Sequence, residues 1–172
     1  MQKNMGKMKK ILSGLLVVIV LFSSCLKNHE ADGVTCNSSY DPCALKASDA
    51  EIDSVESYLS AKGITDAVKH CSGMYYKIDS VGTGKTADVC SVIGIKYVGK
   101  LANDTIFDHS TNVVGFDMSR LIAGFKNGIP LIKEGGGIHL YIPPSLGFGS
   151  QQNDKIPPNS LLIFEVSLVG VQ

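Results

Sequence analysis

The sequence of 172 residues contains no tryptophan and has no net charge, because its 16 basic and 16 acidic side chains balance. The two signs are unevenly distributed. Residues 1–24 carry four lysines and no acid, and the rest of the chain carries 12 basic and 16 acidic residues. A protein that binds nucleic acid needs a basic footprint for the phosphates. The main part of the chain lacks that footprint, so nucleic acid is not expected as a partner.

Metal-binding spacing is also missing, because no Cys-x-x-Cys pair occurs and the four histidines are scattered. No metal site and no cofactor are therefore predicted. Hydrophobic residues make up 44% of the chain and charged residues 19%, a composition typical of a folded globular protein. At this length a single folded domain with additional terminal segments is expected.

The N-terminus has the features of an export signal. Three lysines at positions 7, 9 and 10 precede an uncharged, mostly apolar run over residues 11–22. That run is too short to span a bilayer, which needs about 20 residues, but it has the length of a signal-peptide core. Phe22-Ser23-Ser24-Cys25 follows and resembles the lipobox of bacterial lipoproteins, with phenylalanine where an aliphatic residue is commoner. An ordinary cleaved signal peptide is the alternative.

The lipobox resemblance implies that residues 1–24 are removed and that Cys25 is lipidated. The chain would then be exported and held by a lipid anchor at a membrane, on the periplasmic side or at the outer membrane. Leu26 is not an aspartate, which by analogy favours the outer membrane. Residues 25–47 are rich in turn-forming residues and are predicted to be a polar tether.

Four cysteines remain besides Cys25, and an even number in an exported chain suggests disulfides. The candidates are Cys36, Cys43, Cys71 and Cys90. Pairing between near neighbours is favoured, Cys36 with Cys43 and Cys71 with Cys90. Crossed pairings stay open, and they would fasten the tether to the domain.

Secondary-structure signals divide the rest of the chain into a helix and a β-rich part. Ser48 and Glu51 form a capping box, apolar residues follow at helical spacing, and Gly63 ends the run, so residues 48–62 are predicted to be an amphipathic helix. Residues 48–72 would be an N-terminal extension. Strands are expected over residues 74–81, 89–101, 105–107, 116–118, 138–142 and 161–169, with one short helix over residues 119–127. This pattern without βαβ repeats predicts an α+β domain with an antiparallel sheet.

Several short stretches together carry a family resemblance from about Gly73 to the end of the chain. They are Ile95-Lys96-Tyr97-Val98-Gly99, Ile106-Phe107-Asp108, Leu121-Ile122-Ala123-Gly124-Phe125, Tyr141-Ile142-Pro143-Pro144 with Gly147-Phe148-Gly149, Ile156-Pro157-Pro158-Asn159, and Leu161-Leu162-Ile163-Phe164-Glu165-Val166. In this order and spacing, residues 73–172 resemble an FKBP-type peptidyl-prolyl cis-trans isomerase domain. The resemblance implies a twisted antiparallel sheet of about five strands wrapped around one short helix.

The same resemblance implies the site residues. Tyr97, Asp108, Ile122 and Phe148 would act on the substrate, with the Ile122 N–H holding a substrate carbonyl and Asp108 near the twisting amide. The apolar lining would come from Phe107, Phe116, Leu121, Phe125, Ile156 and Phe164. Taken as single residues, the phenylalanines fit an ordinary core equally well, and Asp108 fits a turn.

Three departures from the family pattern weaken the expected activity. Phe148 stands where many members have tyrosine, Val114 lies near a position that is often aromatic, and the segment from His109 to Gly115 reads as a short loop. The tryptophan that many relatives place at the pocket floor is here Phe125.

The expected function is an anchored prolyl isomerase that acts on proline-containing segments of exported, unfolded proteins. A macrolide inhibitor of the family is a possible ligand, and the isolated domain is expected to be a monomer. The alternative is a non-catalytic FKBP-like module or chaperone that only holds such segments.

Overall fold

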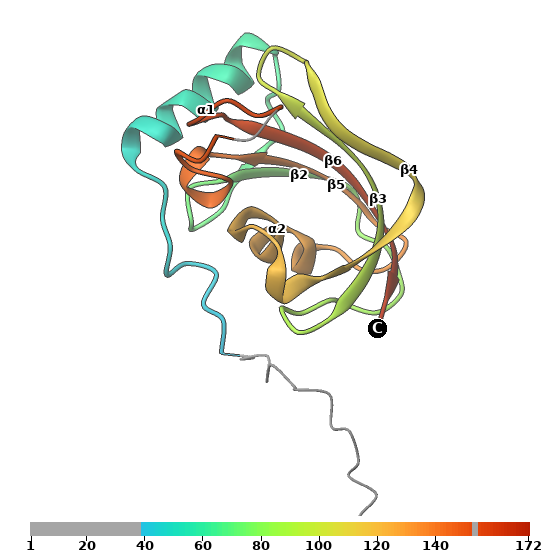
Figure 1. The fold of residues 1–172 in the computed structure, drawn as a ribbon. Helices are drawn as coiled ribbons and strands as arrows, with labels where there is room; N and C mark the ends of the chain where they lie inside the picture. The colour runs from blue at the N-terminus through green and yellow to red at the C-terminus, as the bar shows by residue number, and fades with distance from the viewer. Residues whose placement is uncertain (1–38, 153–154) are drawn as a thin grey trace, which may run out of the picture. The chain divides into compact units, whose positions relative to one another are not determined.

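The computed structural model describes residues 39–152 and 155–172, which form a curved antiparallel sheet with a helix on either side (Figure 1). The strands are β1 (Val68–Lys69), β2 (Tyr75–Ser80), β3 (Val92–Leu101), β4 (Ile106–Asp117), β5 (Gly137–Ile142) and β6 (Leu162–Val171). Their order in the sheet is β1-β2-β5-β6-β3-β4, and every neighbouring pair is antiparallel. The predicted α+β class is confirmed, with the two-residue β1 as an addition.

The strand β4 corrects the expectation of a loop over residues 109–115. Residues 106–117 form one strand, paired with β3 along most of its length. Ile95 pairs with Val114 and Tyr97 pairs with Ser110, so the register shifts and β4 holds extra residues over this stretch. A bulge of this kind takes up additional residues without leaving the sheet and increases the local twist. The turn signal at Asn103 and Asp104 remains as the hairpin between β3 and β4, where Asp104 has φ +66°.

The main core lies between the concave face of the sheet and the helix α2 (Ala123–Gly128) (Figure 1). Alternate residues of a strand point to opposite faces, so Ile138, Leu140 and Ile142 of β5 are buried in this core. The helix approaches β5 closely because two of its positions carry no side chain. A Cβ atom on Gly124 or Gly128 would lie 2.5 Å and 2.4 Å from the side chains of Ile142 and Leu140, respectively.

The helix predicted over residues 119–127 is interrupted in the structure. A 3₁₀ turn (Met118–Arg120) comes first, then Leu121 and Ile122 are extended, and α2 begins only at Ala123. A second 3₁₀ turn (Ile129–Leu131) follows α2. The cause is local, because the Asp117 carboxylate accepts hydrogen bonds from the backbone N and the Oγ of Ser119 at 2.9 Å and 2.6 Å. Such side-chain bonds to nearby backbone compete with continuous helix.

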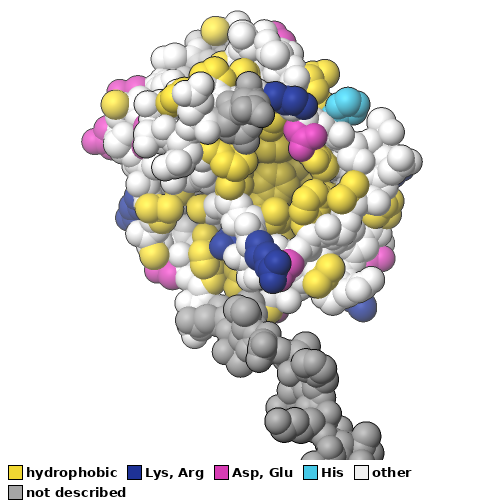
Figure 2. Space-filling model, in the orientation of Figure 1, with side chains coloured by type: hydrophobic (Ala, Val, Ile, Leu, Met, Phe, Trp, Pro, Cys, Tyr) yellow, Lys and Arg dark blue, Asp and Glu magenta, His cyan; other side chains and the backbone are white. Residues whose placement is uncertain are grey.

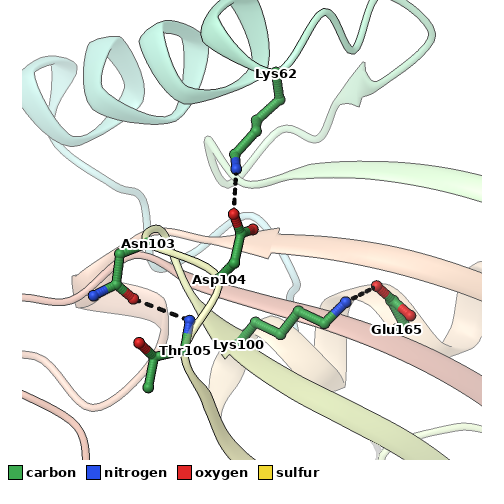
Figure 3. A network of polar contacts seen from close by, with 6 residues as sticks. All are labelled: Lys62, Lys100, Asn103, Asp104, Thr105 and Glu165. Carbon is green, nitrogen blue, oxygen red and sulfur yellow. Dashed lines mark hydrogen bonds and ion pairs between the residues drawn. The ribbon is translucent and has the colours of Figure 1, made fainter.

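The helix α1 (Asp49–Ala61) agrees with the prediction, including the reciprocal capping box of Ser48 and Glu51. Its buried residues Val55 and Leu59 form a second core on the opposite face of the sheet, with Tyr141 of β5, Ile163 of β6 and Leu161 directly before β6. Beyond its C-terminus, Lys62 pairs with Asp104 of the β3–β4 hairpin at 2.6 Å (Figure 3). Among the described residues, no helix is both long and apolar enough to cross a membrane.

Residues 39–47, here called the docked segment, lie against the domain instead of continuing as free tether. Cys43 forms a disulfide with Cys71, with the Cα atoms 5.5 Å apart. The Ala47 N–H donates to the Ser72 carbonyl at 2.9 Å, and the Tyr40 hydroxyl donates to the Asn127 Oδ1 at 2.7 Å.

This disulfide shows that the favoured pairings Cys36–Cys43 and Cys71–Cys90 are wrong. The docked segment runs back along the domain and brings Cys43 beside Cys71, which is the crossed arrangement that fastens the N-terminal side to the domain. Cys90 is also disulfide-bonded. Cys25 and Cys36 lie outside the described residues, so the lipidation prediction is not addressed by the structure.

Candidate active site

A pocket of about 210 Å³ opens between α2, the residues just before it, and the concave face of β3, β4 and β6. Figure 2 shows hydrophobic side chains gathered around a hollow in the middle of this face. Ten residues line the pocket: Ile95, Tyr97, Asp108, Phe116, Arg120, Leu121, Ile122, Phe125, Phe148 and Phe164. Eight of the ten residues with an expected role are therefore brought together, counting the four acting and six lining positions.

The floor of the pocket is built from aromatic rings packed edge to face. Phe164 is central, with the Phe125 ring 4.8 Å away at 83° and the Phe107 ring 5.4 Å away at 85°. Tyr97 adds a tilted contact to Phe164 at 6.4 Å and an edge-to-face contact to Phe116 at 6.0 Å. Edge-to-face pairs of this kind are favourable beyond their buried area, so the floor is closely packed as well as apolar.

The sheet places these rings through its alternation and through one glycine. Tyr97 of β3 is paired with Val166 of β6, and Gly99 is paired with Phe164. A Cβ atom on Gly99 would lie 2.7 Å from the Phe107 ring and 2.8 Å from the Phe164 ring. Only glycine at this strand position lets the two rings meet over the backbone.

A polar pair in the aromatic wall joins Tyr97 and Asp108. The Tyr97 hydroxyl donates to the Asp108 Oδ2 at 2.7 Å, and the His109 N–H donates to the Asp108 Oδ1 at 2.9 Å. Burial, and then the bond to Asp108, raise the pKa of Tyr97 to about 12. The tyrosine therefore stays protonated and the carboxylate keeps a fixed orientation at neutral pH.

The backbone of Leu121 and Ile122 forms the opposite wall. Both residues are extended, and the Ile122 carbonyl accepts from the Phe125 and Lys126 N–H groups at the start of α2. The Ile122 N–H has no backbone acceptor among the described residues. A donor in this position remains available to a ligand carbonyl at the pocket wall.

Two expected lining residues lie behind the surface of the pocket. Phe107 and Ile156 are buried in the main core, and Phe107 acts on the pocket through its contact with Phe164. Phe148 lies at the rim, and the residue is 38% exposed. It offers an apolar edge and no hydroxyl donor.

Sequence reasoning missed two lining residues, Ile95 and Arg120. Ile95 precedes Tyr97 by two positions on the same strand, so strand alternation places it on the same face and could have identified it. Arg120 had no sequence signal, because its place at the rim follows from the 3₁₀ turn before Leu121.

Comparisons with known proteins identify the family of the β-rich part of the chain. Residues 84–169 match the model of the FKBP-type peptidyl-prolyl cis-trans isomerase family. A probable FKBP-type isomerase of Haemophilus influenzae is 41% identical over 104 residues, which cover 58% of this chain and 43% of that protein. The probable isomerase FkpA of Neisseria meningitidis serogroup B is 38% identical over 121 residues, which cover 67% and 44%. The chain thus spans less than half the length of these curated relatives.

Solved structures agree at the level of the fold. The crystal structure of FkpA from Escherichia coli has a TM-score of 0.65 and 28% identity, covering 72% of this chain and 60% of that one. The crystal structure of AtFKBP13 has a TM-score of 0.58 and 30% identity, covering 63% of this chain and 100% of that one. From its family match and its fold, this chain belongs to the FKBP-type peptidyl-prolyl cis-trans isomerase family.

Proposed function

We propose that the chain catalyses cis-trans isomerisation of X–Pro peptide bonds in exported proteins. The observation that carries this proposal is the closely packed aromatic pocket with one oriented carboxylate and one available backbone donor at its walls. The membership of the family supports the same reaction.

Peptide-bond isomerisation requires a suitable environment around the amide and no reactive side chain. Rotation about a peptide bond breaks amide resonance, against a barrier of about 18–20 kcal/mol, and makes or cuts no covalent bond. The twisted amide has lost its double-bond character and its carbonyl is less dipolar. An apolar pocket that excludes water therefore favours the twisted state over the planar one, and each 1.36 kcal/mol of difference gives about a tenfold rate.

Each wall of the pocket has a proposed role in this scheme. The proline ring lies on Phe125 and Phe164, between Tyr97 and Phe116. The Ile122 N–H donates to a substrate carbonyl and fixes the chain on one side of the bond. Asp108, held by the Tyr97 hydroxyl, faces the amide as it rotates. Holding one side of the bond in place while the other side rotates lowers the barrier by orienting the substrate.

The location at the membrane is part of the same proposal. Lipidation of Cys25 would hold the domain at the membrane, and the preceding residues would act as the export signal. The Cys43–Cys71 disulfide supports an oxidising compartment, because structural disulfides persist outside the cytosol. Mass spectrometry of the membrane fraction tests the anchor, since a diacylated or triacylated N-terminal peptide beginning at Cys25 is expected.

The catalytic role is tested with the full chain in an assay of proline-peptide isomerisation at 25 °C. Replacing Asp108 by alanine is expected to lower kcat/KM by roughly 2- to 12-fold, the range of one net hydrogen bond. Asp104→Ala is the matched control, because Asp104 is exposed on the same hairpin and pairs with Lys62 outside the pocket. Phe148→Tyr is expected to raise kcat/KM by restoring a hydroxyl at the rim. Equal rates for the wild type and Asp108→Ala would remove Asp108 from the mechanism.

A non-catalytic binding module is the second candidate, and the exposed Phe148 without a donor favours it. The two are separated by measuring binding and turnover on the same sample. A folded protein that binds a proline peptide or the family's macrolide inhibitor, yet leaves the isomerisation rate at the buffer value, would be a binding module.

A further inference from the structure

Arg120 is the only cation among the residues that line the described pocket. Its side chain is 81% exposed, and it reaches the pocket from the 3₁₀ turn directly before Leu121 and Ile122. The other charged lining residue is Asp108. Arg120 and Asp108 therefore carry opposite charges at the pocket, and they differ in how far their polar atoms are already hydrogen-bonded.

The Asp108 carboxylate is already engaged on both oxygens, by the Tyr97 hydroxyl and the His109 N–H. Arg120 is engaged much less. A guanidinium has five N–H donors, and its only ion pair within the described chain joins its Nε to the Asp117 Oδ2 at 3.5 Å. Arg120 therefore offers a ligand several N–H donors, whereas both oxygens of the Asp108 carboxylate already accept hydrogen bonds.

The acid beside Arg120 engages only part of its guanidinium group. The Asp117 Oδ1 accepts hydrogen bonds from the Ser119 N–H and Oγ, and the Asp117 Oδ2 lies 3.5 Å from the Arg120 Nε. Hydrogen bonds from Ser119, and then the charges of Arg120 and Lys126, lower the pKa of Asp117, so it is ionised at neutral pH. Because Asp117 meets Arg120 through Nε alone, the other guanidinium N–H groups of Arg120 are left for a ligand.

We infer that Arg120 is a specificity-determining residue, which selects substrates with an acidic side chain immediately before the proline. This inference rests on the proposed isomerase function. The residue before proline is joined to the ring by the bond that rotates, so its Cα lies about 3.8 Å from that of proline in the trans form. When the ring lies in the pocket, that side chain is at the rim, within the reach of a long and flexible arginine.

Kinetics with matched peptides test the inference. Three otherwise uncharged peptides carry Glu, Gln or Lys before the proline, and exchange is measured by NMR so that no protease preference enters. The full chain is expected to show a kcat/KM for Glu about 1.5- to 5-fold above that for Gln, the range for an exposed ion pair, and below Gln for Lys. At 1 M salt the Debye length falls to about 3 Å, and the ratios should approach one.

The variants separate Arg120 from the general field of the protein. Arg120→Gln is expected to make the three peptides equivalent, and Arg120→Glu to reverse their order. Lys126→Gln is the matched control, since Lys126 lies on the same part of the chain but faces the Tyr40 ring at 6.0 Å. This control should keep the preference for Glu.

The outcomes distinguish the inference from the function on which it rests. Acceleration of the Gln peptide with equal rates for all three charges would leave the isomerase standing and overturn the selection. A preference for Glu that persists in Arg120→Gln would also overturn it. No acceleration of any peptide would overturn the isomerase and the selection together.

Discussion

Removing the Cys43–Cys71 disulfide tests how the N-terminal side of the chain stabilises the domain. The two cysteines are 28 residues apart in the sequence. Cross-linking a loop of this length lowers the entropy of the unfolded chain, and the standard chain-entropy relation gives about 3.6 kcal/mol at 25 °C. The double variant Cys43→Ser, Cys71→Ser should lose that much unfolding free energy, and it keeps the cysteine at position 90 unchanged.

The loss of unfolding free energy should include contacts with α2, because the docked segment contacts that helix from outside the pocket. The Tyr40 hydroxyl donates to the Asn127 Oδ1, and Asn127 is only 3% exposed. Its Nδ2 has no partner among the described residues. If the segment detaches, the buried amide loses its Tyr40 donor, which adds about 0.5–1.5 kcal/mol to the cost.

Urea unfolding of the oxidised proteins, followed by far-UV circular dichroism, measures both effects. The double variant is expected to lose about 4–5 kcal/mol in total, as the sum of the loop term and the Tyr40 hydrogen bond. Tyr40→Phe in the disulfide-bonded chain isolates the second term and should lose about 1 kcal/mol. A double variant within about 1 kcal/mol of the wild type would refute the reasoning, because the loop-closure term would then be absent.

Three further changes test the pocket. Gly99→Ala should lower the unfolding free energy by about 1–3 kcal/mol through overpacking against Phe107 and Phe164, and should lower kcat/KM. Gly115→Ala is the control and should change neither quantity, because a Cβ atom there meets nothing within 4 Å. Equal melting temperatures of the two variants would contradict this. Tyr97→Phe frees Asp108 and should lower kcat/KM roughly 2- to 12-fold with unchanged secondary structure. The pKa of Tyr97 is raised to about 12 in the fold. The contribution of this hydroxyl to stability is therefore complete below about pH 10 and is lost as the pH rises through 12. The unfolding free energies of the wild type and of Tyr97→Phe, measured from pH 8 to 12, should converge only at the alkaline end.

Local signals in the sequence predicted most of the fold. The capping box of Ser48 and Glu51 and the glycine at position 63 bound α1 correctly, because caps act through neighbouring residues. The richness of residues 89–101 in β-branched side chains identified β3, because such side chains favour strands. The continuity of β4 was missed because a bulge makes a strand read as a loop in sequence.

The remaining errors come from interactions between distant residues. The disulfide pairing depends on the path of the docked segment along the domain, and sequence spacing alone does not determine it. The position of Arg120 at the rim depends on the turn that Asp117 and Ser119 make before α2. The pocket residues were expected through the family pattern, because buried phenylalanines such as Phe125 and Phe164 look the same in any apolar core.

The central claim is that the aromatic pocket catalyses rotation about X–Pro bonds. Its most direct test is the exchange rate of an uncharged proline peptide with the purified full chain at 25 °C, measured by NMR as a function of protein concentration. We predict a rate above the uncatalysed exchange, which takes tens to hundreds of seconds, with a linear rise as protein is added and a smaller slope for Asp108→Ala. A wild-type rate equal to that in buffer at every concentration would contradict the account.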